Sequence, residues 1–209
     1  MKLRSISEAF SHGLVMQRVL DRLRRIGIDI DPFLVFVEGT CDVESPPVDG
    51  DYEAFRISVD DLASLDTLGS GFSTDALRER LLKGHICIAL KHRGRVVAYT
   101  WADTAEINDA SCRTKLGTNE VYLYDAFTSP EYRGRGLAPL MRIRSYEALR
   151  ALGKSTFFSI SDYFNTPAIR FKRKLNARFV RLCISLRIGK RRLGVWTIKT
   201  YPRGEEAAP

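Results

Sequence analysis

The spacing of apolar residues divides the chain into predicted strands and helices. Short apolar runs and strict alternation of apolar and polar residues predict strands, whereas apolar residues three and four positions apart predict helices. The predicted strands span residues 32–37, 54–57, 85–90, 96–101, 121–127, 155–160, 180–188 and 195–199. The predicted helices span residues 6–26, 59–67, 73–83, 137–152 and 166–175. We therefore expect an α/β fold in which a sheet is flanked by helices.

A connector rich in proline and acidic residues, 41–51, divides the chain into unequal parts. We expect an N-terminal extension of one helix and one strand over residues 1–50, a main domain over 51–201 and a tail over 202–209. The predicted helix 6–26 is amphipathic and basic. We expect its apolar side to pack on the main domain; the alternative is a position on a membrane surface.

The junction between the strand at 121–127 and the helix at 137–152 carries the strongest chemical signal. It reads Ser-Pro-Glu-Tyr-Arg-Gly-Arg-Gly-Leu-Ala over residues 129–138. Glycines allow a tight turn that directs several N–H groups to one place, and a helix N-terminus adds unpaired N–H donors and a positive dipole end. This combination predicts a site for a phosphate or diphosphate group.

Two common phosphate-binding motifs do not fit this part of the chain. The dinucleotide motif needs a third glycine and an acidic residue about twenty positions later, and the junction has neither. Gly153-Lys154-Ser155 lacks the glycine that a P-loop requires at position 148, where the chain has Ala148. Gly153 is better interpreted as the end of the preceding helix.

A third motif fits. Arg133-x-x-Gly136-x-Ala138 resembles the pyrophosphate-binding turn of the GNAT (Gcn5-related N-acetyltransferase) superfamily, whose pattern is Gln/Arg-x-x-Gly-x-Gly/Ala. The following strand and the helix that begins after Asn165 are similar to that family in order and type. The resemblance covers residues 53–200. It implies a mixed, mostly antiparallel sheet whose central strands splay apart, and an N-acyltransferase that uses acetyl-CoA as acyl donor without a metal.

The resemblance also implies which residues bind the donor. The pyrophosphate is expected on the N–H groups of the turn, which are those of Arg133, Gly134, Arg135, Gly136, Leu137 and Ala138. The thioester is expected beside Ala126, Phe127 and Thr128, with the Ala126 N–H polarising its carbonyl. Asn165 is expected to bond the pantetheine amides, and it is also a candidate helix N-cap.

The catalytic residues are less clear, because the chain departs from the family at the usual acid and base positions. Tyr122 and Tyr124 stand where relatives often have a Glu or His base. Glu120 is the best carboxylate candidate on the same strand face, and Asp125 replaces it if a bulge reverses the alternation. Lys172 stands where relatives place a tyrosine acid, for which Tyr124 and Tyr163 are substitutes. Each candidate also has a purely structural interpretation.

Charge and cysteine usage add expectations about partners and compartment. The 209 residues carry a net charge of +8; residues 131–203 are strongly basic, and residues 31–130 have an excess of acidic side chains. An acidic surface favours a cationic amine acceptor (a small molecule, an amino sugar or a peptide), or it is only solvated. Scattered cysteines indicate a reducing, cytoplasmic location. A homodimer is possible.

Other function classes receive less support. No apolar run is long enough to span a membrane, and the three histidines form no metal-binding pattern. Two alternatives remain: a GNAT-like protein that binds acyl-CoA without transferring the acyl group, and a basic module for nucleic acid or membrane surfaces. The second lacks a recognisable nucleic-acid motif, so no specific nucleic acid is expected.

Overall fold

The computed structural model describes residues 15–39, 45–66, 68 and 71–201. The predicted first helix is observed over residues 15–25, and its residues 6–14 lie outside the described part. The tail 202–209 and the connector residues 41–44 lie outside it too. Every other predicted element is present, with ends shifted by a few residues.

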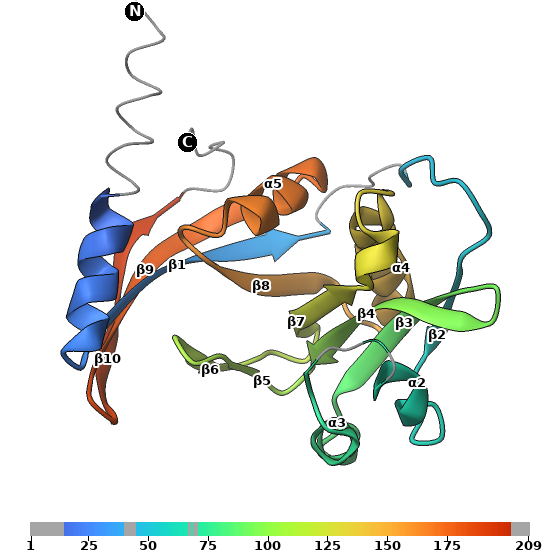
Figure 1. The fold of residues 1–209 in the computed structure, drawn as a ribbon, viewed down its shortest axis with the longest axis horizontal. Coiled ribbons are helices and arrows are strands. Elements are labelled where there is room, and N and C mark those ends of the chain that lie inside the picture. Colours follow the sequence, from blue (N-terminus) through green and yellow to red (C-terminus); the bar gives the residue numbers. More distant parts are fainter. Residues whose placement is uncertain (1–14, 40–44, 67, 69–70, 202–209) are drawn as a thin grey trace, which may run out of the picture.

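One large sheet forms the centre of the molecule (Figure 1). Its eight strands follow the order β10 (Arg191–Thr200), β9 (Arg178–Ile188), β1 (Ile28–Glu38), β8 (Thr156–Asp162), β7 (Glu120–Thr128), β4 (Arg95–Asp103), β3 (Ile86–His92) and β2 (Glu53–Arg56). Neighbouring strands are antiparallel except β7 and β8, which are parallel. A separate hairpin of β5 (Glu106–Asn108) and β6 (Arg113–Lys115) was not predicted, because Ile107 is its only apolar strand residue.

The parallel strands β7 and β8 pair only at their beginnings. Register partners run from Glu120 opposite Thr156 to Tyr122 opposite Phe158, after which both strands continue without pairing to each other. The backbone groups beyond this point on the facing edges are therefore available to another partner. This divergence confirms the predicted mixed, mostly antiparallel sheet with splayed central strands.

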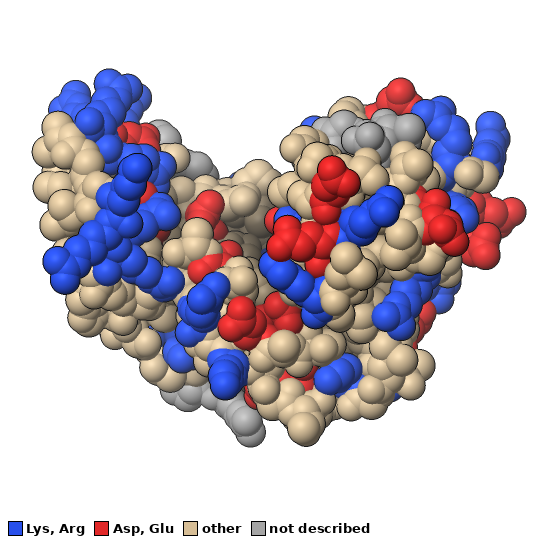
Figure 2. Space-filling model, turned by 90° about the horizontal axis from the view of Figure 1, so that it is seen from below, with Lys and Arg blue, Asp and Glu red and all other residues tan. Residues whose placement is uncertain are grey.

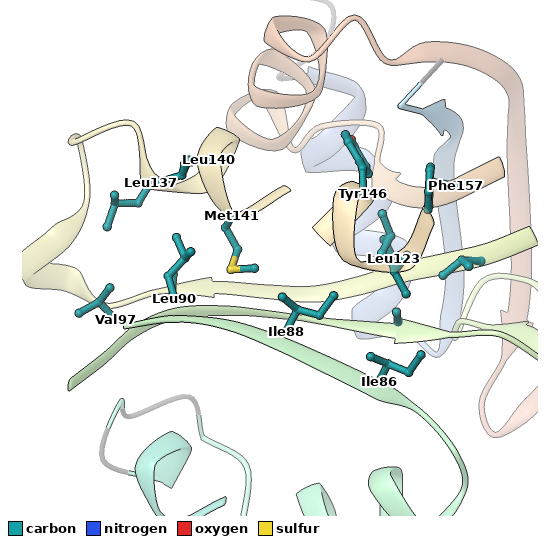
Figure 3. Packing of buried hydrophobic residues seen from close by; sticks show 14 residues of the cluster. Ile86, Ile88, Leu90, Val97, Leu123, Leu137, Leu140, Met141, Tyr146 and Phe157 are labelled. Atoms are coloured by element: carbon teal, nitrogen blue, oxygen red, sulfur yellow. The ribbon is translucent and has the colours of Figure 1, made fainter. Parts of the chain in front are cut away.

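Helices cover both faces of the sheet beside the divergence. α4 (Leu137–Arg150) lies on one face of β3, β4 and β7, and its Leu137, Leu140 and Met141 belong to a buried cluster with strand residues such as Leu90 and Val97 (Figure 3). α2 (Leu62–Asp66) and α3 (Thr74–Leu82) pack on the opposite face in a second apolar cluster. α5 (Thr166–Lys174) packs against α4. Alternate residues of β3 supply the two clusters, as strand geometry requires: Ile86, Ile88 and Leu90 belong to the first, and Cys87 and Ala89 to the second.

The strand of the predicted N-terminal extension lies inside the sheet. β1 is longer than the predicted strand 32–37 and pairs with β8 on one side and β9 on the other. The helix before it is only partly covered: Leu20 and Leu23 are half-buried, whereas Val15 and Met16 are exposed. The domain division at residue 50 stays a prediction, but β1 joins the main sheet as a central strand.

Glu38 at the end of β1 is a buried charge with partners from three other elements. Its carboxylate accepts hydrogen bonds from Tyr146 of α4, at 2.6 Å, and from Ser159 of β8. Arg142 Nε lies 3.2 Å away, and Lys172 Nζ of α5 lies at 3.9 Å. Burial alone raises the pKa of Glu38, but the two cations and the two hydrogen bonds outweigh it and bring the pKa below its usual value.

We predict that Glu38→Gln lowers the free energy of unfolding by about 3–5 kcal/mol, because it leaves the buried Arg142 guanidinium without its counter-charge. Urea denaturation at pH 7 measures the change. Glu147→Gln is the matched control: Glu147 pairs with Arg144 on the helix surface, where a salt bridge contributes at most about 1 kcal/mol. If both variants lower the free energy of unfolding equally, the buried network around Glu38 does not make the large contribution that we assign to it.

Candidate functional site

The divergence of β7 and β8 opens a cleft of about 770 Å³. Its walls come from the second halves of both strands, the start of α4 and the start of α5. Figure 2 shows the surface hollowed between the part that carries β9, β10 and the N-terminal helix and the part that carries β2–β4. Acidic side chains lie beside this hollow, and basic side chains gather on the β9–β10 part.

The glycine-rich turn forms one end of the cleft. Gly134 and Gly136 have φ of +78° and +76°, a conformation that favours glycine. Gly136 is the N-cap of α4, and no side chain caps this helix. The N–H groups of its first turn therefore have no capping side chain, and the positive end of the helix dipole lies beside the cleft.

A second hollow of about 400 Å³ adjoins the cleft on the outer side of the turn. It shares Thr128, Arg133 and Ala138 with the cleft, and Arg170 and Lys174 of α5 add two further cations. The side chain of Arg135, unlike those two, lines neither hollow, and its guanidinium lies 5.0 Å from the ring centre of Tyr132. Uncapped N–H groups and three cations around a turn suit a diphosphate and a further phosphate, so the residues present fit the phosphates of CoA.

The sequence analysis did not find Arg170 and Lys174. They lie four residues apart on α5, which places them on one helix face. That spacing is visible in the sequence, but it indicates a phosphate site only once the structure shows that α5 lies beside the turn.

A bulge interrupts β7 beside the cleft. The pairing of β7 with β4 skips Asp125 and Ala126, opposite the single residue Thr100, and Asp125 has φ of +44°. The predicted cofactor residues Ala126, Phe127 and Thr128 all line the cleft there. The bulge is the one on which the alternative candidate Asp125 depended, and Asp125 lines the cleft, paired with Arg80 of α3 at 2.8 Å.

Asn165 and Lys172 contribute the opposite wall. Asn165 lines the cleft and caps α5, its side-chain oxygen accepting a hydrogen bond from the Ala168 N–H at 3.2 Å. Lys172 also lines the cleft, although its side chain is only 4% exposed. Its Nζ donates to the Ile160 carbonyl oxygen at 3.0 Å. Burial lowers the pKa of Lys172 to about 7, against the attraction of Glu38, and Arg142 lowers it further.

The structure separates the candidate bases. Glu120 lies where β7 and β8 are still paired, does not line the cleft, and accepts a hydrogen bond from the Gly117 N–H at 2.7 Å. Tyr122 and Tyr124 do line the cleft, and their rings stack with centres 5.5 Å apart. Burial raises the pKa of each tyrosine above its usual value. Tyr163, a substitute acid, is 40% exposed and lies outside the cleft lining.

The unpredicted β5–β6 hairpin closes one side of the cleft. Asn108, Asp109 and Ala110 line it, and Tyr122 donates a hydrogen bond to Asp109 at 3.1 Å. Across the gap, Arg192 of β10 donates to the Ser111 carbonyl oxygen at 2.6 Å. The loop between β5 and β6 thus connects the two diverging halves of the sheet.

Comparison with known families identifies this arrangement. Residues 57–177 match the family model described as the acetyltransferase (GNAT) family. The chain belongs to the GNAT family. The match includes the turn, the diverging strands and both helices that line the cleft of this GNAT protein.

Solved structures share the GNAT fold at low sequence identity. A GNAT-family acetyltransferase described as putative, from Novosphingobium aromaticivorans, is 22% identical with a TM-score of 0.55, covering 79% of this chain and 68% of that one. A functionally unknown conserved protein from Staphylococcus epidermidis is 8% identical with the same TM-score, covering 81% and 66%. A glucosamine N-acetyltransferase region of a fungal multi-domain β-N-acetylglucosaminidase is 14% identical with a TM-score of 0.55, covering 79% and 22%. No curated protein matches.

The described residues contain neither a candidate membrane span nor a candidate metal site. Among them, no helix is both long and apolar enough to cross a membrane. The same part of the chain has no group of His, Cys, Asp and Glu residues that could hold a metal ion.

We predict that Lys172→Met changes how stability depends on pH. Lys172 has a lower pKa in the folded chain, about 7, than its ordinary 10.5, so the unfolded chain binds one more proton between these values. The wild-type unfolding free energy therefore rises with pH in this window relative to the variant, by about 1.4 kcal/mol per pH unit. Urea denaturation from pH 7 to 10 measures the difference. Lys174→Met, on the exposed side of the same helix, is expected to show no such slope.

Proposed function

We propose that this GNAT protein transfers the acetyl group of acetyl-CoA to an amine. The observation that carries the proposal is the uncapped glycine turn at the entrance of a cleft between two diverging strands. The turn supplies an anion site, and the cleft runs from it along unpaired strand backbone. A phosphate-bearing donor with a long, amide-containing arm suits both parts.

The chain's own residues then have distinct tasks in donor binding. N–H groups of Gly134–Ala138, with Arg133, Arg170 and Lys174, hold the phosphates, and Asn165 bonds the amides of the arm. Acetyl-CoA supplies an activated acyl group as a thioester. The Ala126 N–H, which the bulge releases from pairing with β4, stabilises negative charge at the acyl oxygen. One such donor contributes about 3 kcal/mol to catalysis.

Lys172 is the proposed source of the proton that the leaving sulfur takes up. Its Nζ sits in the cleft wall, on the helix that begins at Asn165. A pKa of about 7 lets the ammonium give up a proton at neutral pH, which an ordinary lysine does poorly. Glu38 and the Ile160 carbonyl fix the position of the nitrogen.

The acceptor side of the cleft favours a cationic amine. Asp109, Asp125 and Asp162 lie in its wall; Asp125 pairs with Arg80, and the charge of Asp109 acts on Lys172. Carboxylates at a cleft raise the local concentration of cations and orient them. The acceptor class therefore includes small amines, amino sugars and the amino groups of peptides.

One observation favours a second candidate function, acyl-CoA binding without transfer. The best predicted carboxylate base, Glu120, points its carboxylate to Gly117 rather than into the cleft. A chain without a base binds the donor and releases no CoA on addition of amines. A screen of amines for CoA release, detected by its free thiol, separates the two functions.

We predict that Gly136→Asp abolishes acetyl-CoA binding while the fold persists, because a carboxylate then occupies the phosphate position. Isothermal titration calorimetry is the measurement, with circular dichroism to check folding. Gly153→Asp is the matched control: Gly153 has the same left-handed φ, +78°, but follows the far end of α4. Wild-type affinity in Gly136→Asp contradicts the assigned donor site.

We also predict that Lys172→Arg lowers kcat about 10²-fold with little change in acetyl-CoA affinity. Arginine keeps the positive charge beside Glu38 but cannot release its proton near neutral pH. Steady-state CoA release and calorimetry give the two quantities. Unchanged turnover in this variant removes Lys172 from the proton transfer.

A further inference from the structure

Behind the cleft wall, three side chains from adjacent strands form a continuous chain of contacts. The Tyr124 hydroxyl on β7 bonds to Nδ1 of His85, the residue before β3. His85 Nε2 lies 3.3 Å from Asp103 Oδ2 at the end of β4. Tyr124 lines the cleft, whereas His85 and Asp103 lie behind it. Nothing in the motif analysis pointed to His85 or Asp103.

The contacts of the three side chains favour one assignment of their protons. Asp103 Oδ1 accepts from the backbone N–H groups of Ala105, at 2.8 Å, and Glu106, at 3.1 Å. The remaining oxygen, Oδ2, lies 3.3 Å from His85 Nε2, so we assign the proton of the neutral ring to Nε2. His85 Nδ1 then has a free lone pair, and the Tyr124 hydroxyl donates to it. This assignment follows from the hydrogen-bond network.

The surroundings keep His85 neutral before it accepts a proton. Burial lowers the pKa of His85, and Asp103 opposes this. Arg80 of α3 and Lys83, which caps the end of that helix, lower the pKa further, while Glu106 of β5 raises it. Tyr124 is the other titratable group in contact, and burial raises its pKa, so its hydroxyl stays protonated. A neutral imidazole with a free lone pair is a competent base at pH 7.

We propose that Tyr124, His85 and Asp103 remove the proton from the acceptor amine; this rests on the proposed function. An N–H bond of the acceptor ammonium breaks and its proton passes to the Tyr124 oxygen. The Tyr124 proton moves to His85 Nδ1, and the imidazolium is stabilised by Asp103. The amine keeps the electron pair and becomes the nucleophile. His85, whose side chain is 18% exposed, returns the proton to water.

The neighbouring Tyr122 and Asp109 form a rival path. Asp109 accepts hydrogen bonds from Tyr122 and from both the N–H and the hydroxyl of Ser111. Its oxygens are therefore occupied by donors that also shape the β5–β6 loop. In the Tyr124 chain, by contrast, the hydroxyl donates to a base that can keep the proton.

The test compares pH profiles of kcat/KM for an amine acceptor found in the CoA-release screen. His85→Gln keeps a donor and an acceptor but cannot take up a proton. We expect kcat/KM to fall about 10²-fold, and the loss of activity at acidic pH that reports His85 protonation to disappear. Acetyl-CoA affinity stays unchanged. Tyr124→Phe gives a similar loss, and the double variant loses no more than either single variant, because the groups act in series.

His92→Gln is the matched control. His92 also bonds a tyrosine, Tyr132, through Nδ1 at 3.1 Å, but lies outside the cleft lining, so its pH profile stays that of the wild type. A pH profile of kcat/KM in His85→Gln that matches the wild type overturns the proton path. So does a profile in which Asp109→Asn, and not His85→Gln, removes the loss of activity at acidic pH. If acetyl-CoA binds but no amine in the screen causes CoA release, that result contradicts the proposed function instead.

An acceptor-independent measurement examines the same path. Imidazole ¹⁵N shifts report the tautomer of His85, which the His85→Gln spectrum assigns. We expect the neutral ring to carry its proton on Nε2. A proton on Nδ1 overturns the proposal, because that nitrogen then donates to Tyr124 and cannot receive its proton.

Discussion

The buried carboxylate of Glu38 is the constraint around which the cleft is built. An isolated charge in the interior costs far more free energy than the protein can supply, so it has to be surrounded by opposite charge and hydrogen-bond donors. Those partners come from α4, α5 and β8. Because each partner must reach the Glu38 carboxylate at the end of β1, the positions of α4, α5 and β8 are tied to that of β1.

This network also determines the chemistry of the cleft. Arg142 and Lys172 both pair with Glu38 and both line the cleft, so the charge that stabilises the fold also positions two side chains of the cleft wall. β1 fills the space between β8 and β9, and β8 turns away from β7 after only three register pairs. The cleft proposed for the donor therefore depends on the N-terminal strand, which lies outside the GNAT family match at residues 57–177.

Local chemistry was predictable from the sequence, and long-range contacts were not. The turn at 129–138 and the order of strands and helices follow from short patterns, the splayed sheet was implied by the resemblance to the GNAT superfamily, and the structure bears them out. Glu38 meets its hydrogen-bonding partners 108 and 121 residues later, and His85 meets Tyr124 across 39 residues, so no local spacing reveals them. Strand alternation placed Glu120 on the face of Tyr122, but it could not show that β7 and β8 are still paired there.

The central claim is that donor phosphates rest on the N–H groups of the turn before α4. Titration of ¹⁵N-labelled protein with CoA, followed by backbone amide shifts, tests it directly. We expect the largest changes at residues 134–138, with further changes at Ala126, Thr128 and Asn165 along the cleft. Saturable changes confined to β9, β10 and the N-terminal helix, with the turn unaffected, contradict it and assign the anion site to the basic face instead.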